Sequence, residues 1–189
     1  AVLNALSALP RRNVAPIPGT ALHAPRREAR TVREGMDVTQ GKLGMGFACG
    51  SGDESALLLG NLLFGGSSNS KLFLNVREKL SLCYYASSLY HRQKGLITVS
   101  SGVEFADFQR AYEEILAQLA ALGRGEVETW ELEAARGVLR SAYAAMEDSQ
   151  GRLENFYLGQ AIAGRGDSPE DLAREMEETS VERIFRAME

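Results

Sequence analysis

The stretch 64-FGGSSNSKLFLNVREKLSLCYYASS-88 decides the fold, because three kinds of local signal follow one another within it. The glycine- and serine-rich segment FGGSSNS predicts a break in the apolar helix that precedes it. The segment 71–80 then carries Leu72, Val76 and Leu80 at helical spacing. A tyrosine-rich run with the composition of a strand follows directly. The stretch therefore predicts helix, turn, helix and strand in that order.

The segments on either side of this stretch complete the pattern of a mixed fold. Residues 38–49 alternate apolar and small side chains, which is typical of a strand. The runs 83–91 and 96–103 flank the turn Gln93-Lys94-Gly95 and predict a β-hairpin. Several amphipathic helices follow. This order predicts an α+β fold in which an antiparallel sheet has helices packed on one face.

The second face of the predicted sheet is the one that lacks large side chains. If the apolar residues of each strand face the helices, small or polar residues occupy the other face. Such a face either contacts solvent or lines a cavity. The residues assigned to it are Gly44, Gly46, Ala48, Ala86, Ser88, Thr98, Ser100 and Gly102.

The chain divides into a short arm and one domain. Residues 1–30 are rich in proline and charge, which predicts a linker or arm, and residues 31–189 contain the periodic segments. Ser51 and Glu54 are spaced as a capping box for the helix after the first strand. The first residue is not methionine and the last helix has no stop signal, so we expect a fragment of a longer protein.

Composition excludes several classes of function. The net charge of −4 over 189 residues provides no basic footprint for nucleic acid. No apolar run is long enough to cross a membrane, and the first residues, AVLNALSALPRRN, do not have the charged start and apolar length expected of a signal peptide. The two cysteines, Cys49 and Cys83, allow one disulfide by number, but their apolar surroundings favour buried free thiols in a reducing cytoplasm.

The sequence offers no catalytic machinery of its own. The two histidines, His23 and His91, are far apart and have no partners at metal-ligand spacing. The segment GGSSNSK differs from a P-loop because Ser70, rather than glycine, precedes Lys71. No serine lies in a nucleophile elbow. Neither a metal nor a catalytic residue is therefore predicted in this chain.

One pair of residues remains as a candidate binding site. Arg77 lies in the last turns of the helix 71–80, and Tyr84 lies seven residues later at the start of the next strand. Because the chain reverses between them, both side chains can reach the same space. Guanidinium and phenol groups suit the backbone of a peptide. The alternative is that Arg77 has only surface partners and that Tyr84 is a packed strand residue.

This stretch resembles the C-terminal-domain signature of the pitrilysin/insulinase family of zinc metallopeptidases, which includes the mitochondrial processing peptidase. Residues 37–47 resemble the strand that opens that domain, and residues 127–164 resemble its long helix and the next one. The closest resemblance is to a bacterial cytoplasmic branch that has catalytically silent members. The matching signature residues are Gly65, Gly66, Ser70, Lys71, Leu72, Phe73, Val76, Arg77, Glu78, Lys79, Leu82, Tyr84 and Ser88.

The resemblance implies a domain that binds peptide but does not cleave it. Family members close two similar halves like a clamshell over a peptide, and an N-terminal domain or a partner, homodimeric or heterodimeric, supplies zinc and the catalytic glutamate. The second half supplies an arginine and a tyrosine, which correspond to Arg77 and Tyr84. The small-residue sheet face would be a chamber wall. The glycine-rich loop of the silent subunit corresponds to Gly65, Gly66, Ser67 and Ser68, although the loop is shorter here.

Two functions are compatible with this resemblance. The first is substrate binding within a zinc peptidase or its inactive partner, and the second is a purely structural role like that of the core subunits of respiratory complex III. The retained spacing of Arg77 and Tyr84 favours binding. The resemblance also implies a final strand that follows the last helix and is missing here. Whether the longer protein is an active enzyme depends on residues outside this sequence.

Overall fold

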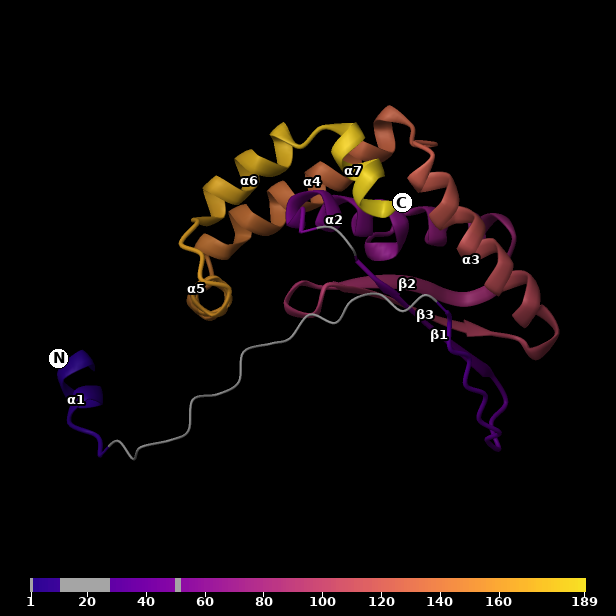
Figure 1. Cartoon of the computed structure of the whole chain (residues 1–189), viewed down its shortest axis with the longest axis horizontal. Coiled ribbons are helices and arrows are strands. Elements are labelled where there is room, and N and C mark those ends of the chain that lie inside the picture. Colours follow the sequence, from indigo (N-terminus) through magenta and orange to yellow (C-terminus); the bar gives the residue numbers. More distant parts are fainter. Residues whose placement is uncertain (1, 11–27, 50–51) are drawn as a thin grey trace.

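The computed structural model describes residues 2–10, 28–49 and 52–189. Its sheet is covered by helices, some of which lie between β1 and β2 in the sequence and others after β3, as the order of periodic segments predicts (Figure 1). The elements in chain order are α1 (Val2–Ser7), β1 (Gly41–Ala48), α2 (Glu54–Asn61), η1 (Leu62–Gly66), η2 (Leu72–Lys79), β2 (Cys83–His91), η3 (Arg92–Lys94), β3 (Leu96–Val103), η4 (Phe105–Asp107), α3 (Phe108–Gly123), α4 (Thr129–Glu147), α5 (Gln150–Ile162), α6 (Pro169–Glu178) and α7 (Val181–Met188).

The sheet of the described residues has three antiparallel strands in the order β1-β3-β2. Strand β3 pairs with β1 from Gly41↔Val103 to Ala48↔Leu96, and with β2 over its whole length. The β2–β3 connection contains Gly95 at a φ of 56°, a left-handed conformation that glycine adopts without strain. The predicted hairpin is confirmed.

The helices lie on one face of the sheet, which confirms the predicted α+β class (Figure 1). The segment α2–η1–η2 packs directly on the sheet together with α3, whereas α7 packs on α2 and α3. Helix α4 packs on the outer side of this layer against α6. The core between sheet and helices is apolar and contains the fully buried Phe64, Leu72, Val76, Val99 and Ile115.

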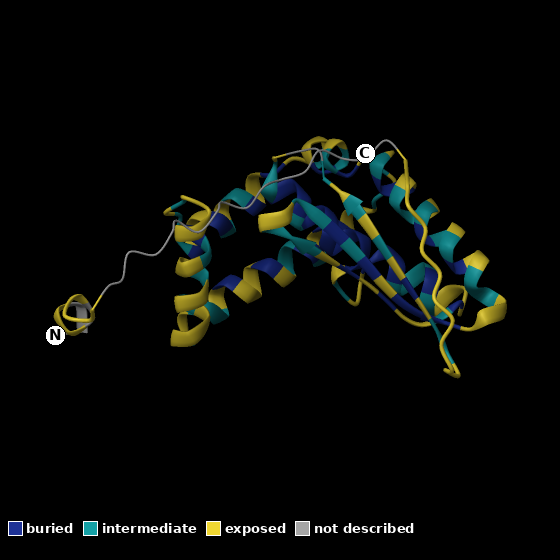
Figure 2. Cartoon of the chain, turned by 60° about the horizontal axis from the view of Figure 1, so that its bottom comes forward, coloured by how far each residue is buried: buried dark blue, intermediate teal, exposed yellow. Residues whose placement is uncertain are grey.

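The predicted composition of the uncovered sheet face is right for two strands and wrong for β2. On β1 and β3, glycine, threonine and serine face away from the helices, as predicted. On β2, however, Ala86 and Ser88 are buried under the helices, whereas Tyr85 and Leu89 are exposed on the other face. Figure 2 shows that buried and exposed residues alternate along the strands of the sheet. The cause is an irregularity between Cys83 and Tyr85, which shifts the alternation of side chains by one residue.

The glycine pair of the signature is helical, and this corrects the predicted break over the whole segment 64–70. Residues Leu62–Gly66 continue α2 as a π-helical turn, and only the following four residues form a turn. A Cβ atom on Gly65 would lie 2.7 Å from the backbone nitrogen of Ser88 and 2.8 Å from a methyl carbon of Leu72. Gly65 therefore allows close approach between the helix and β2.

The start of α2 also differs from the prediction. Asp53 caps this helix, since its carboxylate accepts a hydrogen bond of 3.2 Å from the backbone N–H of Ala56. The predicted capping residue, Ser51, lies outside the described residues. At the start of α6, Ser168 is the cap and Pro169 stands in the first turn, and the Ser168 hydroxyl accepts a hydrogen bond from the N–H of Asp171.

Candidate functional site

Arg77 is held at the end of η2 by three contacts. Its guanidinium lies over the ring of Phe73, one turn earlier, at 4.6 Å from the ring centroid. The Nε atom donates a hydrogen bond of 3.0 Å to the backbone carbonyl of Tyr84, and one terminal nitrogen lies 3.3 Å from a carboxylate oxygen of Glu78. The side chain remains 39% exposed. Arg77 is thus fixed but still open to a ligand.

Tyr84 lies at the irregular start of β2, where the pairing with β3 skips it. The chain reaches this point through Ser81, which has a left-handed backbone with a φ of 51°. The ring of Tyr84 is 57% exposed, and its hydroxyl donates a hydrogen bond to a carboxylate oxygen of Glu104. This bond and the charge of Glu104 raise the pKa of the Tyr84 phenol.

The helix that carries Arg77 is anchored at its other end by a buried ion pair. The ammonium group of Lys71 lies 3.2 and 3.3 Å from the two carboxylate oxygens of Glu131 in α4. Both side chains are more than nine-tenths buried. Glu131 also accepts a hydrogen bond of 2.8 Å from the backbone N–H of Glu128. Farther along η2, Asn75 donates to Gln118 of α3 at 2.8 Å.

The structure brings every predicted site residue to one surface pocket. This pocket has a volume of about 520 Å³ and is open to solvent. Arg77 and Tyr84 also line an adjoining hollow of about 440 Å³, in which Glu78, Ser81 and Glu104 take part. The residues that line the first pocket are Gly65, Gly66, Ser67, Ser68, Phe73, Arg77, Tyr84, Tyr85, Ala86 and Ser87.

Sequence reasoning missed one residue of this site, Glu104. Its contact with Tyr84 follows from sheet register, because Cys83 pairs with Val103 and the residues next to this pair therefore lie close together. The predicted hairpin contained this information, since the residue after the second strand must lie beside the start of the first. No local motif marks Glu104 in the sequence.

The chemistry that the pocket offers is binding rather than bond cleavage. The guanidinium of Arg77 donates hydrogen bonds, and the phenol oxygen of Tyr84 accepts or donates. Cys83 lines the adjoining hollow, but burial raises the pKa of its thiol, which disfavours the nucleophilic thiolate. Both cysteines are free and only half-buried, whereas the sequence predicted full burial.

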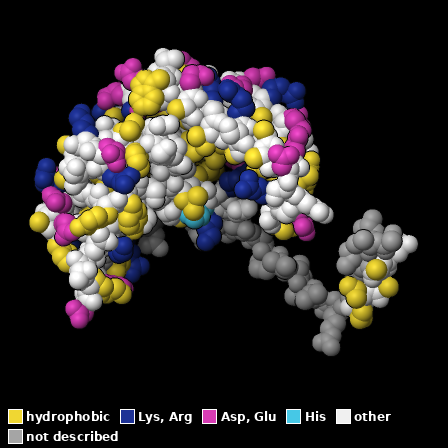
Figure 3. All heavy atoms as spheres, turned by 180° about the vertical axis from the view of Figure 1, so that it is seen from behind, with side chains coloured by type: hydrophobic (Ala, Val, Ile, Leu, Met, Phe, Trp, Pro, Cys, Tyr) yellow, Lys and Arg dark blue, Asp and Glu magenta, His cyan; other side chains and the backbone are white. Residues whose placement is uncertain are grey.

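The described part of the chain contains no group of three or more metal-binding side chains, so the donor set does not fit a zinc site. His91 bonds through Nε2 to the hydroxyl of Thr98 at 3.0 Å, and His23 lies outside the described residues. No helix within these residues has the length and apolarity to span a membrane. Basic and acidic side chains intermingle on the face shown in Figure 3.

Comparison with known proteins identifies one family. The family model described as the peptidase M16 inactive domain matches residues 2–139. YmfF of Bacillus subtilis (strain 168), described as a probable inactive metalloprotease, is 36% identical over 166 residues, which cover 86% of this chain and 39% of that protein. The chain spans about two fifths of the length of the curated relatives it matches.

Solved structures agree with the fold. A conserved protein from Enterococcus faecalis V583 superimposes with a TM-score of 0.74 at 29% identity, covering 80% of this chain and 37% of that one. A peptidase M16 inactive domain from Pseudomonas fluorescens gives a TM-score of 0.72 at 21% identity, covering 81% and 38%. The second likeness concerns the fold alone.

Proposed function

The chain belongs to the peptidase M16 family as an inactive domain, and we propose that it binds an extended peptide for a zinc metalloendopeptidase without cleaving it. The binding groups are Arg77 and Tyr84. The observation that carries this proposal is that both line one open pocket together with Gly65, Gly66 and the following serines. An extended peptide presents unpaired backbone N–H and C=O groups to such a surface.

In this proposal the catalytic groups belong to another domain or subunit. The described residues do not fit a zinc site, so zinc and a general base come from a zinc-bearing family domain, in the same polypeptide or in a homo- or heterodimeric partner. The two parts enclose the peptide as a clamshell, with residues 31–189 as the binding domain and residues 1–30 as an arm. This arrangement would resemble a processing peptidase with one silent half.

We also place the chain in the cytoplasm. The support is that Cys49 and Cys83 are both free thiols, which a reducing compartment preserves.

A structural role in assembly is the second candidate. The observation in its favour is that Arg77 and Tyr84 already have partners within the chain, Glu78 and Glu104 among them. In a structural subunit these contacts would hold the start of β2 in place, and no peptide would be needed.

Substitution of the two binding residues separates these functions. We expect Arg77→Ala and Tyr84→Phe each to weaken peptide binding by about tenfold, because each removes a hydrogen bond to the peptide, with charge assistance in the case of Arg77. Titration of the chain with fluorescein-labelled 12-residue peptides from β-casein, an unstructured protein, measures the effect.

Arg140→Ala is the matched control, because Arg140 is an exposed arginine of α4 paired with Glu177. It should leave peptide affinity unchanged. Equal affinities for the wild type, Arg77→Ala and Tyr84→Phe would favour the structural role.

A further inference from the structure

We propose that Glu104 is a positioning residue that orients the Tyr84 hydroxyl so that its oxygen accepts a hydrogen bond from a backbone N–H of the bound peptide. This inference rests on the proposed function and deepens it. It adds a residue that the signature does not contain, and it defines which peptide groups the site recognises.

The hydrogen bond from the Tyr84 hydroxyl to Glu104 determines whether the phenol can donate or accept a further hydrogen bond. A phenol carries one proton, and in this structure that proton is donated to Glu104. The oxygen keeps its lone pairs, and these can only accept. Donation to a carboxylate also polarises the O–H bond and makes the oxygen a better acceptor. With Glu104 in place, Tyr84 therefore presents an acceptor to the pocket.

Arg77 supplies the complementary donor. Its Nε is bonded to the carbonyl of Tyr84, and one terminal nitrogen faces Glu78, so the other terminal nitrogen is available at the pocket wall. The Nε bond also fixes the guanidinium relative to the tyrosine backbone. Arg77 and Tyr84, which line both hollows, thereby offer one donor and one acceptor to the same space.

This pair matches the edge of an extended peptide. In a β-strand the N–H and C=O of one residue point to the same side of the chain. Arg77 would bind the carbonyl, and Tyr84 would bind the N–H. The recognised ligand is thus an extended peptide with an unsubstituted amide at this position, and a proline or an N-methylated residue there would be rejected.

The first test examines the contact without any peptide. In protein labelled with ¹³Cζ-tyrosine, NMR titration reports the phenol pKa of each of the six tyrosines, and Tyr84→Phe identifies the resonance of Tyr84. We expect the Tyr84 pKa to lie above its ordinary value, and Glu104→Gln and Glu104→Ala to lower it. Glu113→Gln, which removes an exposed carboxylate on α3, should leave it unchanged. An identical Tyr84 pKa in the wild type and in both Glu104 variants would overturn the inference.

The second test examines the direction of the hydrogen bond to the peptide. In the β-casein peptide that binds most tightly, each backbone N–H is replaced in turn by an ester oxygen, which removes one donor. We expect one position at which the ester weakens binding to the wild type about three- to tenfold, the worth of one exposed hydrogen bond. The same ester should have no effect on binding to Tyr84→Phe.

The Glu104 variants then connect the two tests. Glu104→Ala should weaken binding of the amide peptide about three- to tenfold in the wild-type background and have no effect in the Tyr84→Phe background. Tighter binding by Glu104→Ala would show that Tyr84 donates and that Glu104 competes, which overturns the acceptor role. If the peptides bind but no ester replacement weakens binding, the acceptor role of the Tyr84 oxygen is overturned while the proposed peptide binding stands. Absence of binding by every peptide overturns the proposed function as well, whereas the NMR result still decides the contact itself.

Discussion

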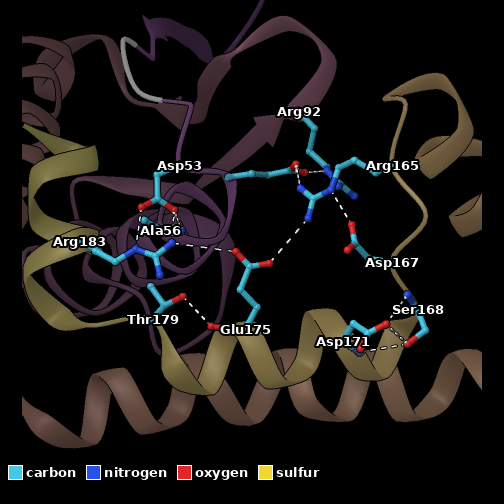
Figure 4. Close-up of polar contacts among 11 residues, drawn as sticks. Asp53, Ala56, Arg92, Arg165, Asp167, Ser168, Asp171, Glu175, Thr179 and Arg183 are labelled. Carbon is cyan, nitrogen blue, oxygen red and sulfur yellow. Dashed lines mark hydrogen bonds and ion pairs between the residues drawn. The ribbon is translucent and has the colours of Figure 1, made fainter.

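Two regions of this molecule hold their elements together by ionic contacts, and they do so in different ways. In the first, Lys71 and Glu131 form one buried pair that anchors η2, the helix of the candidate site. In the second, partly exposed charges gather where α2 begins, around Asp53 and Glu54, whose side chains are 27% and 23% exposed (Figure 4). The first region relies on one ion pair, whereas the second contains several ion pairs.

The second region joins five parts of the chain: the start of α2, the hairpin tip, the loop between α5 and α6, and helices α6 and α7. Glu54 forms ion pairs with Arg92 at the tip of the hairpin and with Arg165 in the loop between α5 and α6. The distance from a terminal nitrogen of Arg165 to a carboxylate oxygen of Glu54 is 2.8 Å. The neighbouring Asp53 pairs with Arg183 of α7 at 2.8 Å. Glu175 of α6 lies 3.7 Å from Arg165 and 4.0 Å from Arg183 (Figure 4).

The difference between the regions is one of solvent access. A buried charge that loses its partner has no water to replace it, so removal of one member is costly. An exposed charge is hydrated again when its partner leaves, and each such pair contributes little. We therefore expect the fold to be sensitive at Lys71 and tolerant at the start of α2. Substitutions of Lys71 and Asp53 test this contrast, and a substitution of Gly65, which packs closely on β2, is expected to fall between them in effect.

Lys71→Met should destabilise the chain most. The substitution leaves the Glu131 carboxylate buried without its cation, and we expect the free energy of unfolding to fall by about 3 kcal/mol. Urea unfolding followed by circular dichroism measures the loss. The double variant Lys71→Met with Glu131→Gln should recover part of it, because the amide is neutral and its oxygen still accepts from Glu128. A loss below about 1 kcal/mol in Lys71→Met would contradict the contrast between buried and exposed pairs.

Gly65→Ala should have the next largest effect. The added methyl group would meet the backbone nitrogen of Ser88 at 2.7 Å, and a strand backbone cannot move aside without disturbing the sheet. We expect a loss of about 2 kcal/mol. The matched control is Gly137→Ala in α4, where a Cβ atom meets nothing within 4 Å, and it should gain up to about 1 kcal/mol of helix stability. Similar effects of the two substitutions would show that Gly65 has no packing role.

The sequence predicted the helix and strand of the candidate site, but it did not predict the ion pairs at the start of α2. Helical spacing located η2, and the strand pattern located β2, because both depend on neighbouring residues. The side-chain phase of β2 was wrong, since the irregularity at Tyr84 depends on its pairing with β3. Arg183 and Asp53 are 130 residues apart, and charged residues of this kind occur all along the chain. The positions of Arg183 and Asp53 in the sequence therefore do not indicate that the two residues pair.

Asp53→Asn should have the smallest effect, and its pH dependence identifies the charge as the cause. Asparagine retains the capping oxygen, but it removes the charge and one of the two hydrogen bonds that Asp53 accepts from Arg183. We expect a loss below about 1 kcal/mol near neutral pH. The bond from Arg183 holds the pKa of the Asp53 carboxyl below its ordinary value of 3.8.

The sign of the pH effect follows from that lowered pKa. As the pH falls, the unfolded chain takes up a proton at Asp53 before the folded chain does, so the stabilising contribution is present above the unfolded value and is lost as the pH falls through the folded value. Wild type should therefore exceed Asp53→Asn in stability above about pH 5, and the difference should shrink as the pH falls below the ordinary Asp pKa of 3.8. Raised salt should narrow the gap at neutral pH, because exposed pairs are screened. A gap that stays constant from neutral to acid pH would assign the loss to the cap rather than to the charge, and the start of α2 would then depend on one specific contact, as η2 does.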